Sequence, residues 1–96
     1  MITRFCFVRL APEHSDLPGR AAVLTRARAL ADDAGLTVRL GVPADDSAAK
    51  WDVAIAIDAP SLDALAAAQL GAAWIELDAH LATHAIVVKT WNFAAA

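Results

Sequence analysis

Apolar and polar residues alternate along the first ten positions, which predicts a β-strand over Met1–Leu10. One face of this strand is mostly aliphatic and is formed by Ile2, Arg4, Cys6, Val8 and Leu10. The opposite face carries Phe5 and Phe7. Because both faces hold apolar side chains, we expect both to be covered in the assembled protein.

The apolar positions that follow recur at helical spacing, which predicts a helix from about Pro18 to Gly35. The stripe consists of Val23, Ala27, Leu30 and Ala34, with Leu24 and Ala31 beside it. Ser15 or Asp16 is suited to cap the helix, and Pro18 suits its first position. Gly35 marks the expected end, since glycine tolerates left-handed backbone geometry.

Two further alternating segments predict strands over Leu36–Val42 and Trp51–Ile57, joined by a loop over 43–49. The side chains expected to face inward are Leu36, Val38, Leu40 and Val42 in the first strand, and Val53, Ile55 and Ile57 in the second. The second strand turns Ala54 and Ala56 to its other face. These small side chains would let another layer approach closely.

A second helix is predicted to begin after Ser61, which is suited to cap it, and to end near Ala82. Asp63 in its first turn lies near the positive end of the helix dipole. Gly71 is expected to kink or interrupt the helix. The apolar stripe resumes around it with Leu70, Trp74, Leu77 and Leu81. The segment IVVKTWNF predicts a last strand over 86–93.

The element order β-α-β-β-α-β predicts an α+β, ferredoxin-like domain that spans residues 1–96. Two helices would cover one face of a four-stranded antiparallel sheet. The other face would carry Phe5, Phe7, Ala54, Ala56 and Trp91 (or Val87), and no element remains to cover it. An exposed apolar sheet face predicts an interface, and a two-fold homodimer is its commonest form.

Composition and net charge limit the classes of molecule that this protein is expected to bind. Hydrophobic residues make up 58% of the chain, above the usual ~45–50%, which again favours a partner subunit. The net charge of −3 and the scattered arginines argue against the extended phosphate-binding face of nucleic-acid-binding proteins. We expect no membrane span and no signal peptide. One cysteine forms no internal disulfide, which suits a cytoplasmic protein.

Candidate chemistry is sparse. Glu76, His80 and His84 share one face of an unbroken helix, a spacing that can hold a metal, but a helix ending near Ala82 would break the alignment. We therefore expect a solvated polar face and no metal. Cys6 lies mid-strand among apolar neighbours, which predicts a buried, unreactive thiol. Asp52 and Asp58 bracket the third strand and are expected to be solvated.

Three tryptophans are costly to leave exposed in a thin domain. Plain core packing is the expectation for at least two of them. Trp74 on the second helix is a candidate for lining a pocket. Trp91 near the C-terminus is a candidate for the dimer seam.

The segments MITRFCFVRL, WDVAIAIDAPSLDALAAA and IVVKTWNF together resemble the stress-responsive A/B barrel (Dabb) family, over nearly the whole chain. The resemblance implies a homodimeric α/β barrel whose two sheets face one another, with a pocket between each sheet and its helices. On this chain that pocket would be lined by Arg4, Cys6, Val53, Ile55 and Trp74. Its ligand would be a small apolar or aromatic molecule, with no cofactor.

The chain departs from the family members that act as polyketide cyclases through histidine and tyrosine. The matching positions here are Arg4, Val53, Ala68, Gly71 and Trp74, so no general base remains and that mechanism is not expected. The alternative to a binding protein is a cofactor-free monooxygenase or a cyclase- or lyase-like enzyme of a related barrel, with Arg4, His14 or His80 in its site. A third hypothesis is a metal or haem binder that uses His80 or His84.

Overall fold

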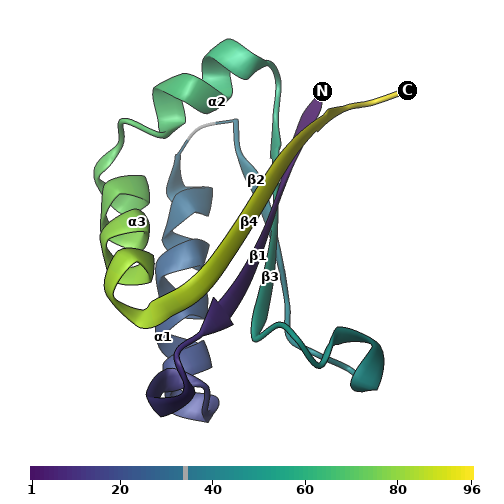
Figure 1. Ribbon diagram of the computed structural model, residues 1–96. Helices are drawn as coiled ribbons and strands as arrows, with labels where there is room; N and C mark the ends of the chain where they lie inside the picture. The colour runs from purple at the N-terminus through teal and green to yellow at the C-terminus, as the bar shows by residue number, and fades with distance from the viewer. Residues whose placement is uncertain (34) are drawn as a thin grey trace.

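The computed structural model describes residues 1–33 and 35–96, and it confirms the α+β, ferredoxin-like fold (Figure 1). Its strands are β1 (Ile2–Leu10), β2 (Thr37–Gly41), β3 (Val53–Ala59) and β4 (Ala85–Ala94). Its α-helices are α1 (Leu17–Arg28), α2 (Leu62–Ala68) and α3 (Ala72–His84). Short 3-10 turns are η1 (Pro12–His14), η2 (Ala29–Asp32) and η3 (Asp46–Ala48).

The four strands form one antiparallel sheet in the order β2-β3-β1-β4. The register pairs Cys6 on β1 with Ile55 on β3 and with Thr90 on β4. Helices α1 and α3 lie against one face of the sheet, and no α-helix of the described residues lies on the other face (Figure 1). The short turn η3 lies at one end of that second face. No helix in the described ranges is both long and apolar enough to cross a membrane.

The core lies between the sheet and its helices, as the alternation predicts. Val8, Val53 and Ile55 from the sheet meet Val23 and Leu30 from the first helical segment, and each is at most 1% exposed. The remaining buried apolar residues are Cys6, Leu10, Ala27, Ile57, Ala59, Leu65, Trp74, Leu77 and Leu81. Trp74 is the one tryptophan of the three in this core.

The predicted caps are confirmed. The Asp16 carboxylate accepts a hydrogen bond from the Gly19 N–H at 2.8 Å, and the Ser61 hydroxyl accepts one from Ala64 N–H at 3.1 Å. Gly71 separates α2 from α3, as expected. The first helix ends earlier than predicted, at Arg28, and η2 continues it to Asp32. Gly35 adopts a φ of 87°, and the stripe position at 34 lies outside the described residues.

Five expectations are wrong. The core holds Trp74 and not two of the three tryptophans, since Trp51 is half-buried and Trp91 is 44% exposed. Val42 is 51% exposed, because β2 already ends at Gly41, and Leu70 is 80% exposed, because it lies in the turn between α2 and α3. The last helix does not end near Ala82 but continues to His84, where the Ala85 N–H closes the final turn on a backbone carbonyl. Asp52, expected in solvent, is only 4% exposed.

Candidate functional site

The sheet face without helices carries a row of aromatic side chains above two alanines. Pairing of β1 with its neighbours places Phe5 between Ala56 and Trp91, and places Phe7 beside Ala54. Aromatic rings meet in three pairs with centroid distances of 5.5–5.7 Å: Phe5 with Phe93, Phe7 with Trp91, and Phe7 with Trp51. The predicted interface residues therefore share this face.

Two aromatic residues of this face were not predicted to belong to it. Trp51 precedes β3, outside the paired part of the strand. Phe93 lies two positions after Trp91 on β4, so alternation from Trp91 could have placed it on this face. Phe93 is 57% exposed and Trp91 is 44% exposed. Large aromatic groups at this exposure form an apolar patch on the face, which is typical of a surface that contacts another molecule. The register also places Arg39, Asp58 and Lys89 on this face, around the patch.

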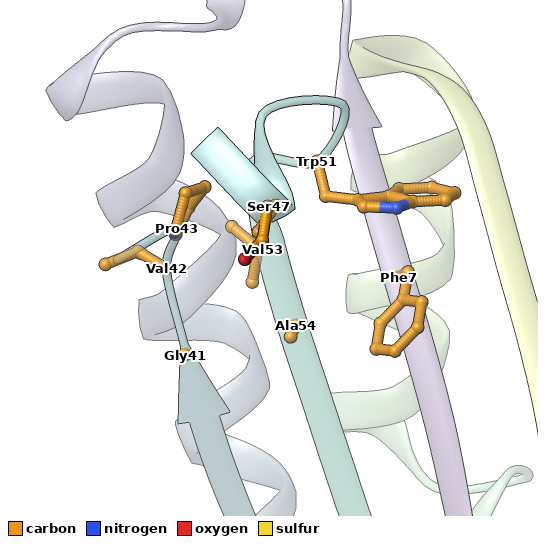
Figure 2. A pocket seen from close by; sticks show the side chains of 9 residues that line it. Phe7, Gly41, Val42, Pro43, Ser47, Trp51, Val53 and Ala54 are labelled. Atoms are coloured by element: carbon orange, nitrogen blue, oxygen red, sulfur yellow. The ribbon is translucent and has the colours of Figure 1, made fainter. Parts of the chain in front are cut away.

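At one end of this face lies a hollow of about 390 Å³ (Figure 2). The indole of Trp51 and the ring of Phe7 form one wall, and Val42 and Pro43 stand on the other side of it (Figure 2). Ala54 lies on the strand between these walls. The remaining lining residues are Gly41, Ser47, Ala48 and Val53. The polar side-chain groups of this lining are the Ser47 hydroxyl and the Trp51 indole N–H, so the hollow suits a mostly apolar guest.

Two more hollows lie on the same face. One, of about 250 Å³, includes Phe5, Arg39 and Ala56, and another, of about 340 Å³, lies among Phe5, Phe7, Trp91 and Phe93. On this face, raised aromatic side chains are therefore separated by grooves. Ridges and grooves of this kind are what a complementary protein surface fills.

The five residues predicted to line a pocket on the helix side lie close to the core. Cys6, Val53, Ile55 and Trp74 are each at most 7% exposed. The guanidinium carbon of Arg4 lies 5.8 Å from the centroid of the Trp74 ring, within cation–π range, and Arg4 donates a 3.2 Å hydrogen bond to Asn92. None of the three hollows on the aromatic face includes Arg4, Cys6 or Trp74.

Cys6 is buried, as the sequence predicts, and burial raises the pKa of its thiol to about 11, with the Arg4 charge opposing the rise. The group is therefore a thiol at neutral pH. A buried, protonated thiol is a poor nucleophile.

We predict that iodoacetamide alkylates Cys6 at pH 8 roughly 100-fold more slowly in the native protein than in protein unfolded in urea. The smaller thiolate fraction in the native protein accounts for this factor by itself, and the closed core slows alkylation further. Mass spectrometry of quenched time points measures both rates. Native-state labelling at the unfolded rate would contradict the buried assignment.

The three histidines of the chain lie in one cluster. The His80 and His84 rings are 3.9 Å apart and nearly parallel, and the His14 ring lies 4.4 Å from that of His84. Burial lowers the pKa of His80, helped by the charges of Arg26, His84 and His14 and opposed by Glu76. Within residues 1–33 and 35–96 no three His, Cys, Asp or Glu side chains are arranged to hold a metal ion.

Asp52 is a polar residue whose importance the sequence did not reveal. Its carboxylate accepts hydrogen bonds from the Leu10 N–H at 2.8 Å, the Ser15 hydroxyl at 2.6 Å and the Arg20 Nε–H at 3.1 Å. Burial alone would raise the pKa of Asp52, but these bonds and the Arg20 charge together hold it below its ordinary value. Asp52 thus joins β1, the loop after it, α1 and the start of β3.

Comparison with known proteins gives a fold and no family. No protein-family model matches the chain, and no curated protein matches it. Among solved structures, a dimeric ferredoxin-like protein of unknown function from Thermobifida fusca YX superposes with a TM-score of 0.81 at 21% identity, over 98% of this chain and 90% of that one. At this identity the likeness shows the fold alone.

Two further solved structures have the same fold. A protein from Nitrosomonas europaea, provisionally assigned as an antibiotic biosynthesis monooxygenase, superposes with a TM-score of 0.81 at 10% identity, covering 99% of this chain and 98% of that one. A dimeric ferredoxin-like protein of unknown function from Bacteroides fragilis gives 0.76 at 10% identity, over 98% and 95%. The neighbours are thus ferredoxin-like proteins, and those from T. fusca and B. fragilis are described as dimeric.

Proposed function

We propose that this chain forms a homodimeric α/β barrel of the stress-responsive A/B barrel type, and that the barrel holds a small apolar or aromatic ligand. The observation that carries the proposal is the sheet face without helices, where aromatic ridges surround an open apolar hollow. Face-to-face pairing of two such sheets would bury the aromatic rows of both copies.

Three features support the dimer. The face carries an aromatic patch, its alanines permit close approach of a second sheet, and its grooves leave room for side chains of a second copy. Closed two-fold pairing buries the same patch on both copies, which is the commonest solution for such a surface. Two structures of the same fold are described as dimeric, which agrees with this arrangement.

The hollow between Trp51 and Val42 is the favoured ligand position. Its volume of about 390 Å³ falls in the range of small-molecule sites, ~300–1,000 Å³. The hydroxyl of Ser47 would orient a single polar group of the ligand. A site on the helix side, at Arg4 and Trp74, would first require the packed core to open, whereas this hollow is open to solvent.

Native mass spectrometry of the protein as purified tests both parts of the proposal. We expect a dimer, and a ligand retained from the cells would appear as added mass that Trp51→Ala removes. A monomer at micromolar concentration would overturn the dimer. A dimer that takes up neither a cellular ligand nor an added aromatic probe such as 1-anilinonaphthalene-8-sulfonate would overturn the binding function.

We predict that Ala54→Glu weakens the dimer roughly 100-fold, because it places a charge beside Phe7 on the aromatic face. Ala54 is only partly exposed in the single chain, and a second sheet would bury it further. Sedimentation velocity across a concentration series measures the effect.

Ala21→Glu is the matched control, since Ala21 is exposed on α1, away from the aromatic face. It should leave the dimer unchanged. Equal sedimentation of wild type and Ala54→Glu would show that the sheets do not pair through this face.

The names of two structural neighbours favour a second candidate, a cofactor-free monooxygenase. Proteins from N. europaea and Deinococcus radiodurans that share the fold are provisionally assigned as antibiotic biosynthesis monooxygenases. An enzyme of this kind would hold an electron-rich aromatic substrate in a dry pocket. Oxygen uptake with a panel of hydroxylated aromatics, lost in Trp51→Ala, would support it. No uptake with any member would leave the binding function as the better account.

A further inference from the structure

Apart from the three hollows on the aromatic face, a hollow of about 390 Å³ lies at the end of the sheet where β1 stops and β4 begins. Its lining is mostly polar, in contrast to the hollow at Trp51. The charged residues in the lining are Arg9, Arg20, Lys50 and Asp52, which amount to three cations and one carboxylate. The chain as a whole carries a net charge of −3, so this site reverses the overall sign.

The carboxylate in this hollow is already fully engaged. Asp52 is buried, one of its oxygens accepts from the Leu10 N–H, and the other accepts from Ser15 and Arg20. It therefore neutralises Arg20 and holds that guanidinium in place through Nε and Nη2. Arg20 Nη1 donates to no other side chain or carbonyl in the part of the chain that the structure describes.

The other two cations have no partner. Arg9 and Lys50 are exposed, and across residues 1–33 and 35–96 neither forms an ion pair or a side-chain hydrogen bond. They come from segments about 40 positions apart, yet both line the hollow beside the anchored Arg20. Like charges brought together without a counter-charge repel each other, and an anion bound between them removes this cost.

We propose that this hollow binds a small dianion, through the guanidinium groups of Arg9 and Arg20 and the ammonium group of Lys50. Two positive charges remain after Asp52 is paired, which matches a ligand with two negative charges. The ligand chemistry is a phosphate group or a pair of carboxylates, because guanidinium groups pair with the oxygens of both. Three cations are too few for the continuous track that nucleic acid requires, so the ligand is a small molecule.

The test is a titration of the ¹⁵N-labelled full chain at constant ionic strength and pH 7, with inorganic phosphate in one series and succinate in the other. We expect saturable shifts at the amides of Leu10, Ser15 and Lys50. The probe with the lower dissociation constant identifies the group. Arg9→Gln and Lys50→Gln should each weaken binding by up to roughly fivefold, the effect of one exposed charge pair.

Arg28→Gln is the matched control, because Arg28 is an exposed arginine at the end of α1 and does not line the hollow. It should bind the probes as the wild type does. Shifts that rise linearly without saturation for both probes would overturn the proposal. So would equal affinities in Arg9→Gln, Lys50→Gln and Arg28→Gln. All three changes are on the surface, and the amide spectra show directly that each variant is folded.

Discussion

Asp52→Ala is expected to lower the free energy of unfolding by about 3–5 kcal/mol, the usual cost of removing one partner of a buried ion pair. The Asp52 side chain is 5% exposed. Its removal leaves the Leu10 N–H, the Ser15 hydroxyl and the Arg20 guanidinium without their acceptor. Water in the neighbouring hollow can reach the part-exposed Arg20 guanidinium, but it replaces the acceptor of the buried Leu10 N–H poorly, so much of the penalty persists.

Urea denaturation at one fixed protein concentration measures this loss. Asp58→Ala is the control, because Asp58 also accepts from two side chains, Thr3 and Arg39, but is 21% exposed. It should cost only about 1 kcal/mol. Equal losses in the two variants would show that burial does not determine how much the Asp52 network contributes to the free energy of unfolding.

The same network fixes how stability responds to acid. Because the pKa of Asp52 is lowered in the folded state, the unfolded chain binds a proton at a higher pH than the folded chain does. The contribution of Asp52 is therefore fully present above the ordinary pKa of aspartate, about 4, and is lost as the pH falls through the lower native pKa. Asp52→Ala should show a correspondingly weaker loss of stability below pH 4.

The sequence predicts the layers of this fold well. The reason is that burying one side of a strand or helix repeats apolar residues every two, three or four positions. Alternation identified the buried faces of β1 and β3, and the four-residue and three-residue spacing identified Val23, Leu30 and Leu81 as core positions. The same alternation left Phe5 and Phe7 on the uncovered face. These are local consequences of strand and helix geometry, so a single segment is enough to reveal them.

The Asp52 network has no such local signal. The acceptor lies 42, 37 and 32 positions from Leu10, Ser15 and Arg20, and only the folded topology brings these groups together. The hollows on the aromatic face have the same origin, because each collects residues from separate strands. The helix-side pocket inferred from family resemblance would be lined by residues that lie close to the core. That pocket remains a prediction.

The length of the last helix was misjudged for a related reason. The segment ATHAIVV contains neither glycine nor proline, the strongest ending signals, so the sequence marks the boundary before the predicted strand only weakly. The chain leaves the helix at Ala85 because β4 must begin there to pair with Leu10. The backbone bond from Ala11 N–H to the His84 carbonyl fixes that point. The boundary is thus set by sheet pairing and not by helix propensity.

Gly19→Ala is expected to cost about 3 kcal/mol or more, at the upper end of the usual cost of overpacking. A Cβ at Gly19 would lie 1.7 Å from the His14 carbonyl oxygen and 2.7 Å from its carbon, so the backbone of η1 must move. A flexible side chain could turn aside, but a backbone carbonyl cannot. Gly41→Ala is the control, since its nearest neighbour would be 3.9 Å away, and it should stay within about 1 kcal/mol of wild type.

The Gly19 and Asp52 effects should also be coupled. The displaced turn η1 leads directly into Ser15, whose hydroxyl binds Asp52, so the clash at Gly19 already disturbs the network that Asp52→Ala removes. A double-mutant cycle should then show the pair costing less than the two single changes together, by about 1 kcal/mol. Strict additivity would mean that η1 relaxes away from α1 without moving Ser15. In that case the two contacts would stabilise this end of the sheet independently.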